Sequence, residues 1–400
     1  MTKRMILRVA LACALAALAR PVDAQSLFAT RGLGLPVASV DARARALGGI
    51  GVGIAGLSTS LANPAETAGL TRTGVTAALQ PSSGTVIFGG EESDLDGARF
   101  PLVRIVLPLS SRIVTSIGYG GVLEQSFGIR TEGTEVVGNE TLSVVDQVES
   151  TGGLSEVGVG IAWTARPGLA LGVGGGLFAG NQRRTVTRTF ADSLVDIHPF
   201  SEEFRWEYRA PFVRVGARWD PASILRLGAS VTVAGDIDAD GQNEHSPDVQ
   251  ASSPLRLTFG GSGFLASDLM LAAGAERLLQ GGSGRVFEND PESSVARDTW
   301  RVGGGLEWGG LGSGARSWPL RVGASWSQLP YHSADETAAQ EWSVTGGVGF
   351  RLAGDPSNPQ AVLDATLERG NRSGFESTEN PAGLEERYWR FTISLSLFGR

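Results

Sequence analysis

Strict period-two alternation near the end of the chain is the feature that most constrains its fold. In residues 385–398 the apolar residues are Trp389, Phe391, Ile393, Leu395 and Leu397, and the polar residues between them are Arg390, Thr392, Ser394 and Ser396. Successive side chains of a β-strand point to opposite faces, so this segment has one apolar face and one polar face. That division fits a strand with lipid on one side and a water-filled interior on the other.

The same alternation recurs along the chain from about residue 73 onward. The segments that alternate, or are bounded by turn residues as strands are, give fourteen predicted strands: 73–89, 98–109, 111–130, 153–165, 168–190, 203–219, 223–236, 253–266, 268–279, 297–310, 317–328, 340–352, 360–371 and 385–398. An even number of antiparallel strands is typical of a bacterial outer-membrane barrel. We therefore predict an all-β, 14-stranded antiparallel transmembrane barrel over residues 73–400.

The connections between these segments alternate in length. Short links such as Ser110, Arg166-Pro167 and Ser267 follow every second strand, and polar loops such as 131–152 and 237–252 follow the others. Short turns on one side and long loops on the other indicate a barrel with both termini in the periplasm. Tryptophans near the strand ends fit the aromatic girdles of such barrels: Trp163, Trp219, Trp300, Trp308, Trp326, Trp342 and Trp389.

Composition excludes several other classes of protein. Charged residues are 19% of the chain and no apolar run reaches the ~18 residues of a membrane-spanning helix, which argues against a helical membrane protein. The net charge of −8 argues against nucleic acid as a partner, because phosphate contacts need clustered positive charge. A secreted β-sandwich or propeller is the alternative, but it would not sort short and long connections by side.

The first 24 residues have the pattern of a secretory signal peptide. Lys3, Arg4 and Arg8 precede an apolar run over residues 9–19, and Val22-Asp23-Ala24 supplies small residues before the expected cleavage site. Cys13, the single cysteine, lies in that run, so the mature chain has no cysteine. Lipoprotein processing at Cys13 is the alternative, although it would shorten the apolar run.

Residues 25–72 do not alternate and predict a compact plug, here called the hatch segment. It contains Ala42-Arg43-Ala44-Arg45-Ala46-Leu47-Gly48-Gly49, then Gly51-Val52-Gly53-Ile54-Ala55-Gly56, and then Asn63-Pro64-Ala65. Small residues interrupted by glycine and proline favour short helical pieces over a strand. With Pro319-Leu320-Arg321-Val322-Gly323 and Gly346-Gly347-Val348-Gly349-Phe350 near the end of the chain, these motifs resemble the FadL family of outer-membrane transporters of hydrophobic compounds.

The resemblance implies a fold and a mechanism. Members of the family have a 14-stranded barrel blocked by an N-terminal hatch. They carry long-chain fatty acids or aromatic hydrocarbons by diffusion, and the ligand leaves sideways near a kinked third strand. The third strand predicted here contains Gly118, Gly120 and Gly121, and adjacent glycines weaken strand pairing. By carry-over, Asn63, Pro64 and Ala65 should contact that weak point, whereas a plain helix-ending turn is the other interpretation.

Ligand contacts are expected from the hatch segment and from inward-facing arginines. The apolar candidates are Phe28, Leu47, Ile50, Ile54, Leu57 and Leu61, and the arginine candidates for a ligand carboxylate are Arg104, Arg256 and Arg321. Two alternatives remain open: the apolar residues pack the plug, and the arginines belong to an ion-pair lattice across the barrel interior.

One acidic loop could bind calcium. Asp236, Asp238 and Asp240 occupy positions 1, 3 and 5 of a calcium-loop pattern, Gly241 follows, and Glu244 is at position 9. Position 12 is Pro247 instead of an acid, so a weak calcium site within residues 236–248 and a solvated acidic loop are both compatible with the pattern. We expect no other cofactor.

Motifs for catalysis are weak. Residues 51–56 match a dinucleotide fingerprint, but no strand precedes them and no helix is expected to start there. The three histidines are far apart, and no Gly-x-Ser-x-Gly motif occurs, so we do not expect an enzyme.

The sequence therefore predicts passive transport of a hydrophobic small molecule across the outer membrane. The other expected partners are outer-membrane lipid, lipopolysaccharide and the barrel-assembly machinery. A non-transporting barrel that acts as a scaffold or secretion-system component is the alternative function, and a general porin is a third.

Overall fold

The computed structural model describes most of the chain after the predicted signal peptide. The described residues are 26–56, 59–137, 140–191, 199–280, 286, 294–310, 316–355, 358–378 and 380–399. The signal-peptide prediction falls on residues 1–24, which lie outside this range, and it stays a prediction.

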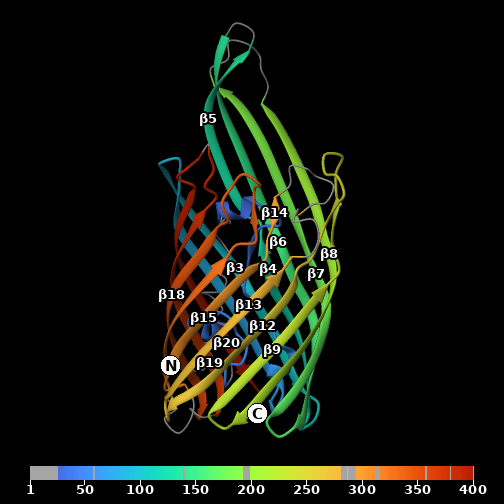
Figure 1. Cartoon of the computed structure of the whole chain (residues 1–400), viewed down its shortest axis with the longest axis vertical. Coiled ribbons are helices and arrows are strands. Elements are labelled where there is room, and N and C mark those ends of the chain that lie inside the picture. The colour runs from blue at the N-terminus through green and yellow to red at the C-terminus, as the bar shows by residue number, and fades with distance from the viewer. Residues whose placement is uncertain are drawn as a thin grey trace.

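Within the described residues, fourteen long strands form a closed antiparallel ring (Figure 1). They are β2 (Gly74–Phe88), β3 (Glu91–Pro108), β4 (Ile113–Glu124), β6 (Glu140–Arg166), β7 (Leu169–Ala191), β8 (Phe200–Ala222), β9 (Leu225–Ala234), β12 (Leu255–Ala266), β13 (Leu269–Leu279), β15 (Thr299–Trp308), β16 (Leu320–Gln328), β18 (Gln340–Asp355), β19 (Asn358–Gly374) and β20 (Leu384–Phe398). The last strand closes on the first, with Val75 opposite Leu397. The predicted 14-stranded barrel is confirmed.

The barrel is apolar outside and polar inside. On β20, Trp389 and Phe391 are 48% and 41% exposed, whereas Thr392 and Ser394 are buried on the inner face. Val159 of β6 is 63% exposed on the outer face. An apolar belt of this extent is stable only against lipid, so the structure is a membrane barrel of the outer-membrane type. None of the helices among the described residues has the length and apolar content to cross a membrane.

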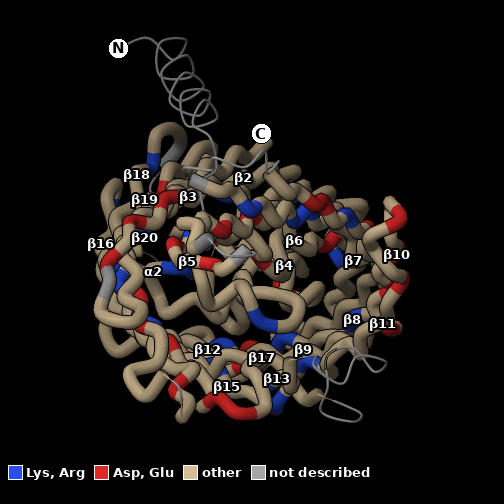
Figure 2. The backbone as a smooth tube through the Cα atoms, turned by 90° about the horizontal axis from the view of Figure 1, so that it is seen from above, with Lys and Arg blue, Asp and Glu red and all other residues tan. Residues whose placement is uncertain are grey.

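The hatch segment lies inside the ring, where Figure 2 shows α2 surrounded by strands. Its elements are η1 (Leu27–Thr30), β1 (Leu35–Pro36), α2 (Ala42–Ala46) and η2 (Pro64–Thr67). The Asp41 carboxylate caps α2 by accepting a hydrogen bond from Ala44 N at 2.7 Å, and Asn63 Oδ1 caps η2 by accepting from Ala65 N at 2.9 Å. These caps satisfy amide groups that short helices leave unpaired.

Close packing of the hatch segment on the wall requires glycine. Gly48 has φ +90°, and a Cβ placed on it would lie 2.3 Å from Gly304 N. Gly53 has φ +72°, and its Cβ would lie 2.4 Å from the carbonyl oxygen of Gly260. Only glycine combines this backbone conformation with such close contact, which explains the glycines that interrupt the hatch motifs.

The prediction of a loop at residues 131–152 was wrong. Residues 127–137 form β5 (Phe127–Val137), which pairs with the upper half of β6, from Val137 opposite Glu140 to Phe127 opposite Ser150. Polar residues on the outward face of β6, such as Ser143, Gln147 and Glu149, hid the strand signal, because its buried apolar residues Leu142 and Val144 point inward. The predicted loop 237–252 likewise contains β10 (Ile237–Gly241) and β11 (Val249–Ala251). The remaining short strands are β14 (Val295–Ala296) and β17 (Tyr331–His332).

Candidate functional site

The wall is interrupted between β3 and β4. These strands pair from Pro108 opposite Val114 up to Leu102 opposite Gly120, and no further. Above that level, the first part of β3 pairs only with β2, whereas β4 continues along β6 with a register shift between Gly121 and Leu123. The structure therefore contains a lateral gap in the barrel wall, bordered by two strand edges, at the predicted third strand.

A groove of about 520 Å³ occupies this gap. Its outer part is lined by Phe100, Tyr119 and Val157, whose side chains are 41–48% exposed on the lipid-facing side. Its inner part reaches Val37 of the hatch segment and Arg99 of β3. The groove thus joins the outer surface of the barrel to the hatch.

The hatch segment lines the inner side of the gap. β1 pairs antiparallel with β4, Leu35 opposite Glu124 and Pro36 opposite Leu123. The amide of Val37 then donates to Val122 O at 2.8 Å, and Ser39 Oγ donates to Gly121 O at 2.7 Å. Part of the strand pairing that β3 would supply at this level therefore comes from the hatch.

Hatch residues outside the Asn63-Pro64-Ala65 triplet lie against the glycines of the predicted third strand. A Cβ on Gly118 would lie 2.5 Å from Leu61, a Cβ on Gly120 would lie 2.7 Å from Ser39, and Gly121 faces Val37. A side chain at 118 or 120 would therefore displace the hatch. The tight contact at this weak point is made by residues 37–39 and Leu61.

The triplet Asn63-Pro64-Ala65 packs mainly on the neighbouring strands. Asn63 Nδ2 donates to Ala217 O of β8 at 3.0 Å, and the backbone of Ala65 lies against Gly172 of β7. Pro64 contacts Gly160 of β6 and lines a small cavity that also borders Gly118. Because η2 also lies against β4, the expectation that the triplet contacts the kink glycines stays a prediction.

Buried ion pairs fix α2 to the wall. Arg43 forms two hydrogen bonds of 2.7 Å with the Glu307 carboxylate of β15, which also accepts from Arg321 Nε at 2.6 Å. Arg321 Nη1 also donates a hydrogen bond of 2.6 Å to Asp364 Oδ1 of β19. All four side chains are buried. Arg321, a predicted ligand residue, is therefore bound by protein carboxylates, which favours the ion-pair lattice.

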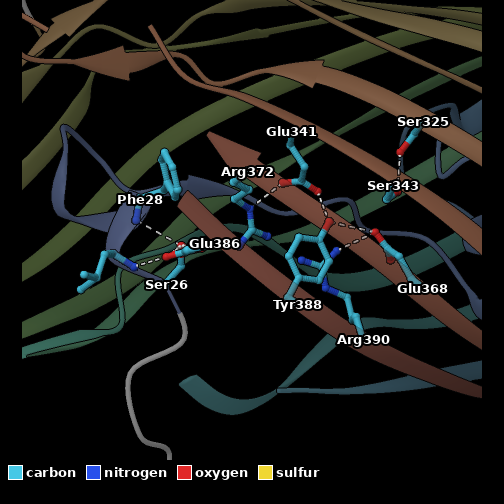
Figure 3. Close-up of polar contacts among 11 residues, drawn as sticks. Ser26, Phe28, Ser325, Glu341, Ser343, Glu368, Arg372, Glu386, Tyr388 and Arg390 are labelled. Carbon is cyan, nitrogen blue, oxygen red and sulfur yellow. Dashed lines mark hydrogen bonds and ion pairs between the residues drawn. The ribbon is translucent and has the colours of Figure 1, made fainter. Parts of the chain in front are cut away.

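A second buried cluster holds the first residues of the hatch segment (Figure 3). The Glu386 carboxylate accepts hydrogen bonds from Ser26 Oγ at 2.8 Å and from Leu27 N at 2.6 Å. Arg372 pairs with Glu386 at 2.9 Å and with Glu341 at 2.7 Å. These contacts tie the hatch to β18, β19 and β20.

Tyr388 is the centre of this cluster. Its hydroxyl donates to Glu341 at 2.6 Å and lies 3.3 Å from Glu368, while Arg372 and Arg390 each lie 4.4 Å from the ring centroid. Sequence reasoning missed Tyr388, although the alternation of β20 places it on the inner face with Arg390.

The other predicted arginines differ in their partners. Arg104 donates to the carbonyl oxygen of Ser60 and to Ser116 Oγ, so it supports the hatch. Arg256 lies 3.8 Å from Glu276 and lines an interior cavity. The carboxylate-binding role of these residues stays a prediction.

Arg99, which sequence reasoning missed, lies where the lateral groove meets the interior cavity. Its Nε donates to Gln80 Oε1 at 2.7 Å, and within the described residues it has no carboxylate at ion-pair distance. Strict alternation from Arg104 would not place Arg99 on the inner face. A register shift against β2, between Ala78 and Gln80, changes which side chains of β3 point inward.

The apolar hatch residues mainly pack the plug. Phe28 contacts Phe375 with ring centroids 4.9 Å apart, Leu47 and Ile54 belong to one buried cluster, Ile50 lies against Gly274, and Leu61 lies against Gly118. Leu57 lies outside the described residues. Their role in ligand binding stays a prediction.

The calcium-loop geometry is not formed. Ile237 and Ala239 are buried in β10, and Asp236, Asp238 and Asp240 alternate with them on the exposed face. Residues two apart on a strand are separated by ~7 Å, so their carboxylates do not surround one ion as a calcium loop requires. Among the described residues, no group of three or more His, Cys, Asp or Glu side chains is arranged to hold a metal.

Comparison with known families identifies the chain. The model of the BamG family matches residues 1–246, more than half of the chain. The chain belongs to the BamG family. A sequence search of curated proteins gives no match for it.

The fold of this BamG-family barrel is that of the FadL-type barrels, as the sequence motifs predicted. A Pseudomonas aeruginosa FadL homologue aligns with a TM-score of 0.57 and 14% identity, over 91% of this chain and 98% of that one. The Ralstonia pickettii toluene transporter TbuX gives 0.56 and 19%, over 94% and 100%. The Pseudomonas putida toluene transporter TodX gives 0.56 and 13%, over 92% and 99%. At these identities the likeness concerns the fold.

Proposed function

We propose that this BamG-family barrel passively transports hydrophobic small molecules across the outer membrane, with the hatch segment as the gate and the gap between β3 and β4 as a lateral exit. The observation that carries the proposal is the groove that joins lipid-facing Phe100 and Tyr119 to Val37 of the hatch. The structurally similar TbuX and TodX are named as toluene transporters, which supports a hydrophobic ligand. In this proposal both termini face the periplasm.

The ligand must displace the hatch in order to pass. Three cavities between the hatch and the wall hold only about 20–40 Å³ each, which is room for a few water molecules. Diffusion down a concentration gradient then requires a transient shift of the hatch, and no energy source is needed beyond the gradient.

Long-chain fatty acids and aromatic hydrocarbons are the two candidate substrate classes. Arg99 at the inner end of the groove favours the fatty acid, because its guanidinium can pair with a carboxylate while the acyl chain follows the apolar groove outward. Replacing Arg99 with glutamine should weaken fatty-acid uptake and leave toluene uptake unchanged.

A reversible cross-link across the gap tests the lateral exit. Pro101→Cys with Leu123→Cys places thiols on the two sides of the groove, and the mature chain has no cysteine to compete if the predicted signal peptide is removed. Uptake of the substrate should fall about tenfold with a cleavable bismaleimide and recover on cleavage. The matched control is Ile105→Cys with Ile117→Cys, two directly paired positions below the gap and outside the groove lining, where a cross-link should change nothing. Unchanged uptake with the first pair would contradict the lateral exit.

Two single variants test the gate. Asn63→Ala removes the cap of η2, and Gly120→Phe inserts bulk against Ser39 and Leu61. Both should lower uptake while the yield of folded barrel, measured by heat-modifiable gel mobility, stays at the wild-type level. Normal uptake in both variants would rule out the hatch-and-kink mechanism.

A non-transporting scaffold or secretion component is the second candidate function. One observation favours it: the firm attachment of the hatch to β15 and β20 by the Arg43–Glu307 and Ser26–Glu386 contacts. Mass spectrometry of organic extracts from the purified barrel separates the two functions. Stoichiometric fatty acid or hydrocarbon, absent from an unrelated barrel prepared identically, supports transport, and an empty barrel supports the scaffold. Lipopolysaccharide and the barrel-assembly machinery stay predicted partners.

A further inference from the structure

A four-stranded sheet of β5 and the upper parts of β6, β7 and β8 rises above the rest of the barrel (Figure 1). β6 alone has 27 residues, whereas a transmembrane strand needs roughly 9–11. The same face of β6 points inward along its whole length, but the chemistry of the two faces changes: in the upper part the outward face carries exposed polar residues, Ser143, Gln147 and Glu149. Val157 and Val159 point outward in the lower part, and Leu142, Val144 and Leu154 are buried in the upper part. The projecting sheet therefore stands in water above the apolar belt.

The two edges of this sheet differ in whether another strand pairs with them. The edge at β8 is covered by the chain itself: β10 pairs with residues 206–209, Gln242 N donates to Arg205 O at 2.9 Å, and Arg205 N donates to Ser246 Oγ at 2.7 Å. The edge at β5 pairs with β6 on one side and, within the described residues, with no strand on the other. Residues 129–136 are all exposed.

An open edge of this length is unusual. β5 extends over 11 residues, so ~37 Å of backbone presents unpaired N–H and C=O groups on one side. Proteins normally protect such edges with proline, lysine or a covering loop, because they readily pair with another chain. β5 contains neither proline nor lysine.

The chain already adds a strand to the same edge lower down. β4 pairs with β6 on one side at Leu123 and Glu124, and on its other side these two residues pair with β1 of the hatch segment. β5 continues along β6 immediately above, from Phe127 opposite Ser150, so its open edge prolongs the one that β1 occupies. Phe127, at the lower end of β5, packs with Phe28 of η1, and residues 129–136 above it have the same edge geometry without a described occupant.

We propose that the open edge of β5 binds an extended segment of a partner protein by β-strand addition at the cell surface. In an antiparallel arrangement, the side chains of the segment would alternate as those of β5 do. On the inner face they would meet Ile129. Val148 and Val186 lie beside Ile129 on the next two strands, so an apolar residue is favoured at this position. On the outer face they would lie beside Arg130 and Glu132, which pair with each other at 3.0 Å, so polar residues are favoured there.

A second copy of the chain does not fit this edge. Two barrels in one membrane are related by an axis along the membrane normal, and β5 rises steeply from the barrel in Figure 1. Such an axis would set two β5 strands parallel, with identical residues side by side but pointing to opposite faces. A pleated ladder requires neighbouring residues to point to the same face. The occupant is therefore a different protein.

Photo-cross-linking in intact cells locates the partner. A benzoylphenylalanine at Arg130, on the open edge, should give one cross-linked protein. The same group at Gln147, its register partner in the middle of the sheet on the same face, should give at least tenfold less. Glu132→Lys should reduce the Arg130 adduct about tenfold, because an edge lysine opposes strand addition, whereas Gln147→Lys should not.

Hydrogen exchange with the cross-linked protein, once purified, completes the test. Addition of that protein to the purified barrel should slow exchange of the β5 amides that face the open edge and leave the upper β6 amides unchanged. An adduct with a second copy of the chain, equal cross-linking at Arg130 and Gln147, absence of an adduct, or unprotected β5 amides would each overturn the proposal. None of these outcomes depends on uptake, so the proposal and the transport function fail separately.

Discussion

Replacing Glu307 with glutamine should loosen the hatch from the wall. The Glu307 carboxylate is 1% exposed and accepts two hydrogen bonds from Arg43 of α2 and one from Arg321. In the variant, Arg321 keeps Asp364, but Arg43 loses its only carboxylate partner among the described residues and keeps neutral acceptors, Ala55 O and the amide oxygen of the glutamine. Breaking one side of a buried ion pair costs about 3–5 kcal/mol, because a buried charge is left uncompensated.

This cost has a measurable consequence for hatch opening. Every 1.4 kcal/mol changes an equilibrium tenfold, so the population with the hatch displaced should rise roughly a hundred- to a few-thousandfold. A single thiol introduced as Ala44→Cys, at a position that is 0% exposed in α2, reports this population by its rate of maleimide labelling.

The matched control is Glu276→Gln. Glu276 is also on the inner wall, but it is partly exposed, lies 3.8 Å from Arg256 and forms no ion pair with any described residue of the hatch segment. Its replacement should cost less than about 1 kcal/mol and change the labelling rate less than tenfold. If Glu307→Gln labels no faster than Glu276→Gln, the ion pairs do not hold the hatch and the reasoning fails.

Three further predictions concern the hatch, the loops and the membrane boundary. Gly53→Ala should weaken hatch docking by at least about 1–2 kcal/mol, because φ is +72° and the new methyl group would meet Gly260 O, and the same labelling assay measures it. Burial alone would raise the pKa of Glu336, but Arg31 and the Ser333 amide hold it below its usual range. The Arg31–Glu336 contact should therefore stabilise the fold above pH ~4.5 and be lost as the pH falls through the lowered pKa, which amide exchange near residue 31 would detect. A fluorophore on a cysteine at position 159 should be quenched by brominated lipid and one at position 151 should not; quenching at both would move the membrane boundary upward.

Local sequence determined the barrel wall. Alternation in segments such as residues 385–398 fixes which side chains face outward, because each strand has only two faces and lipid accepts only one kind of residue. The hatch was also predictable as a unit, since Asp41 and Asn63 are local caps and the glycines between them interrupt any long helix. The fourteen wall strands were predictable for the same reason.

The projecting sheet shows where alternation misleads. In residues 141–150 the apolar side chains of Leu142 and Val144 point inward and the outward residues are mostly polar, so without the membrane as a reference the segment resembles a polar loop. The segment with the candidate calcium ligands was likewise predicted as a loop: its three aspartates alternate with Ile237 and Ala239, which only the pairing of β10 with β8 identifies as buried.

Tertiary structure alone decided how the hatch and the gap are arranged. Arg99 reaches the groove because of a register shift against β2, and Arg321 is bound by Glu307 and Asp364 from two other strands. Ser26 meets Glu386, a partner 360 positions away. Strand direction and side-chain alternation are local properties that the sequence carries by itself. Register between strands, and the charges that register brings together around a plug, exist only once the ring has closed.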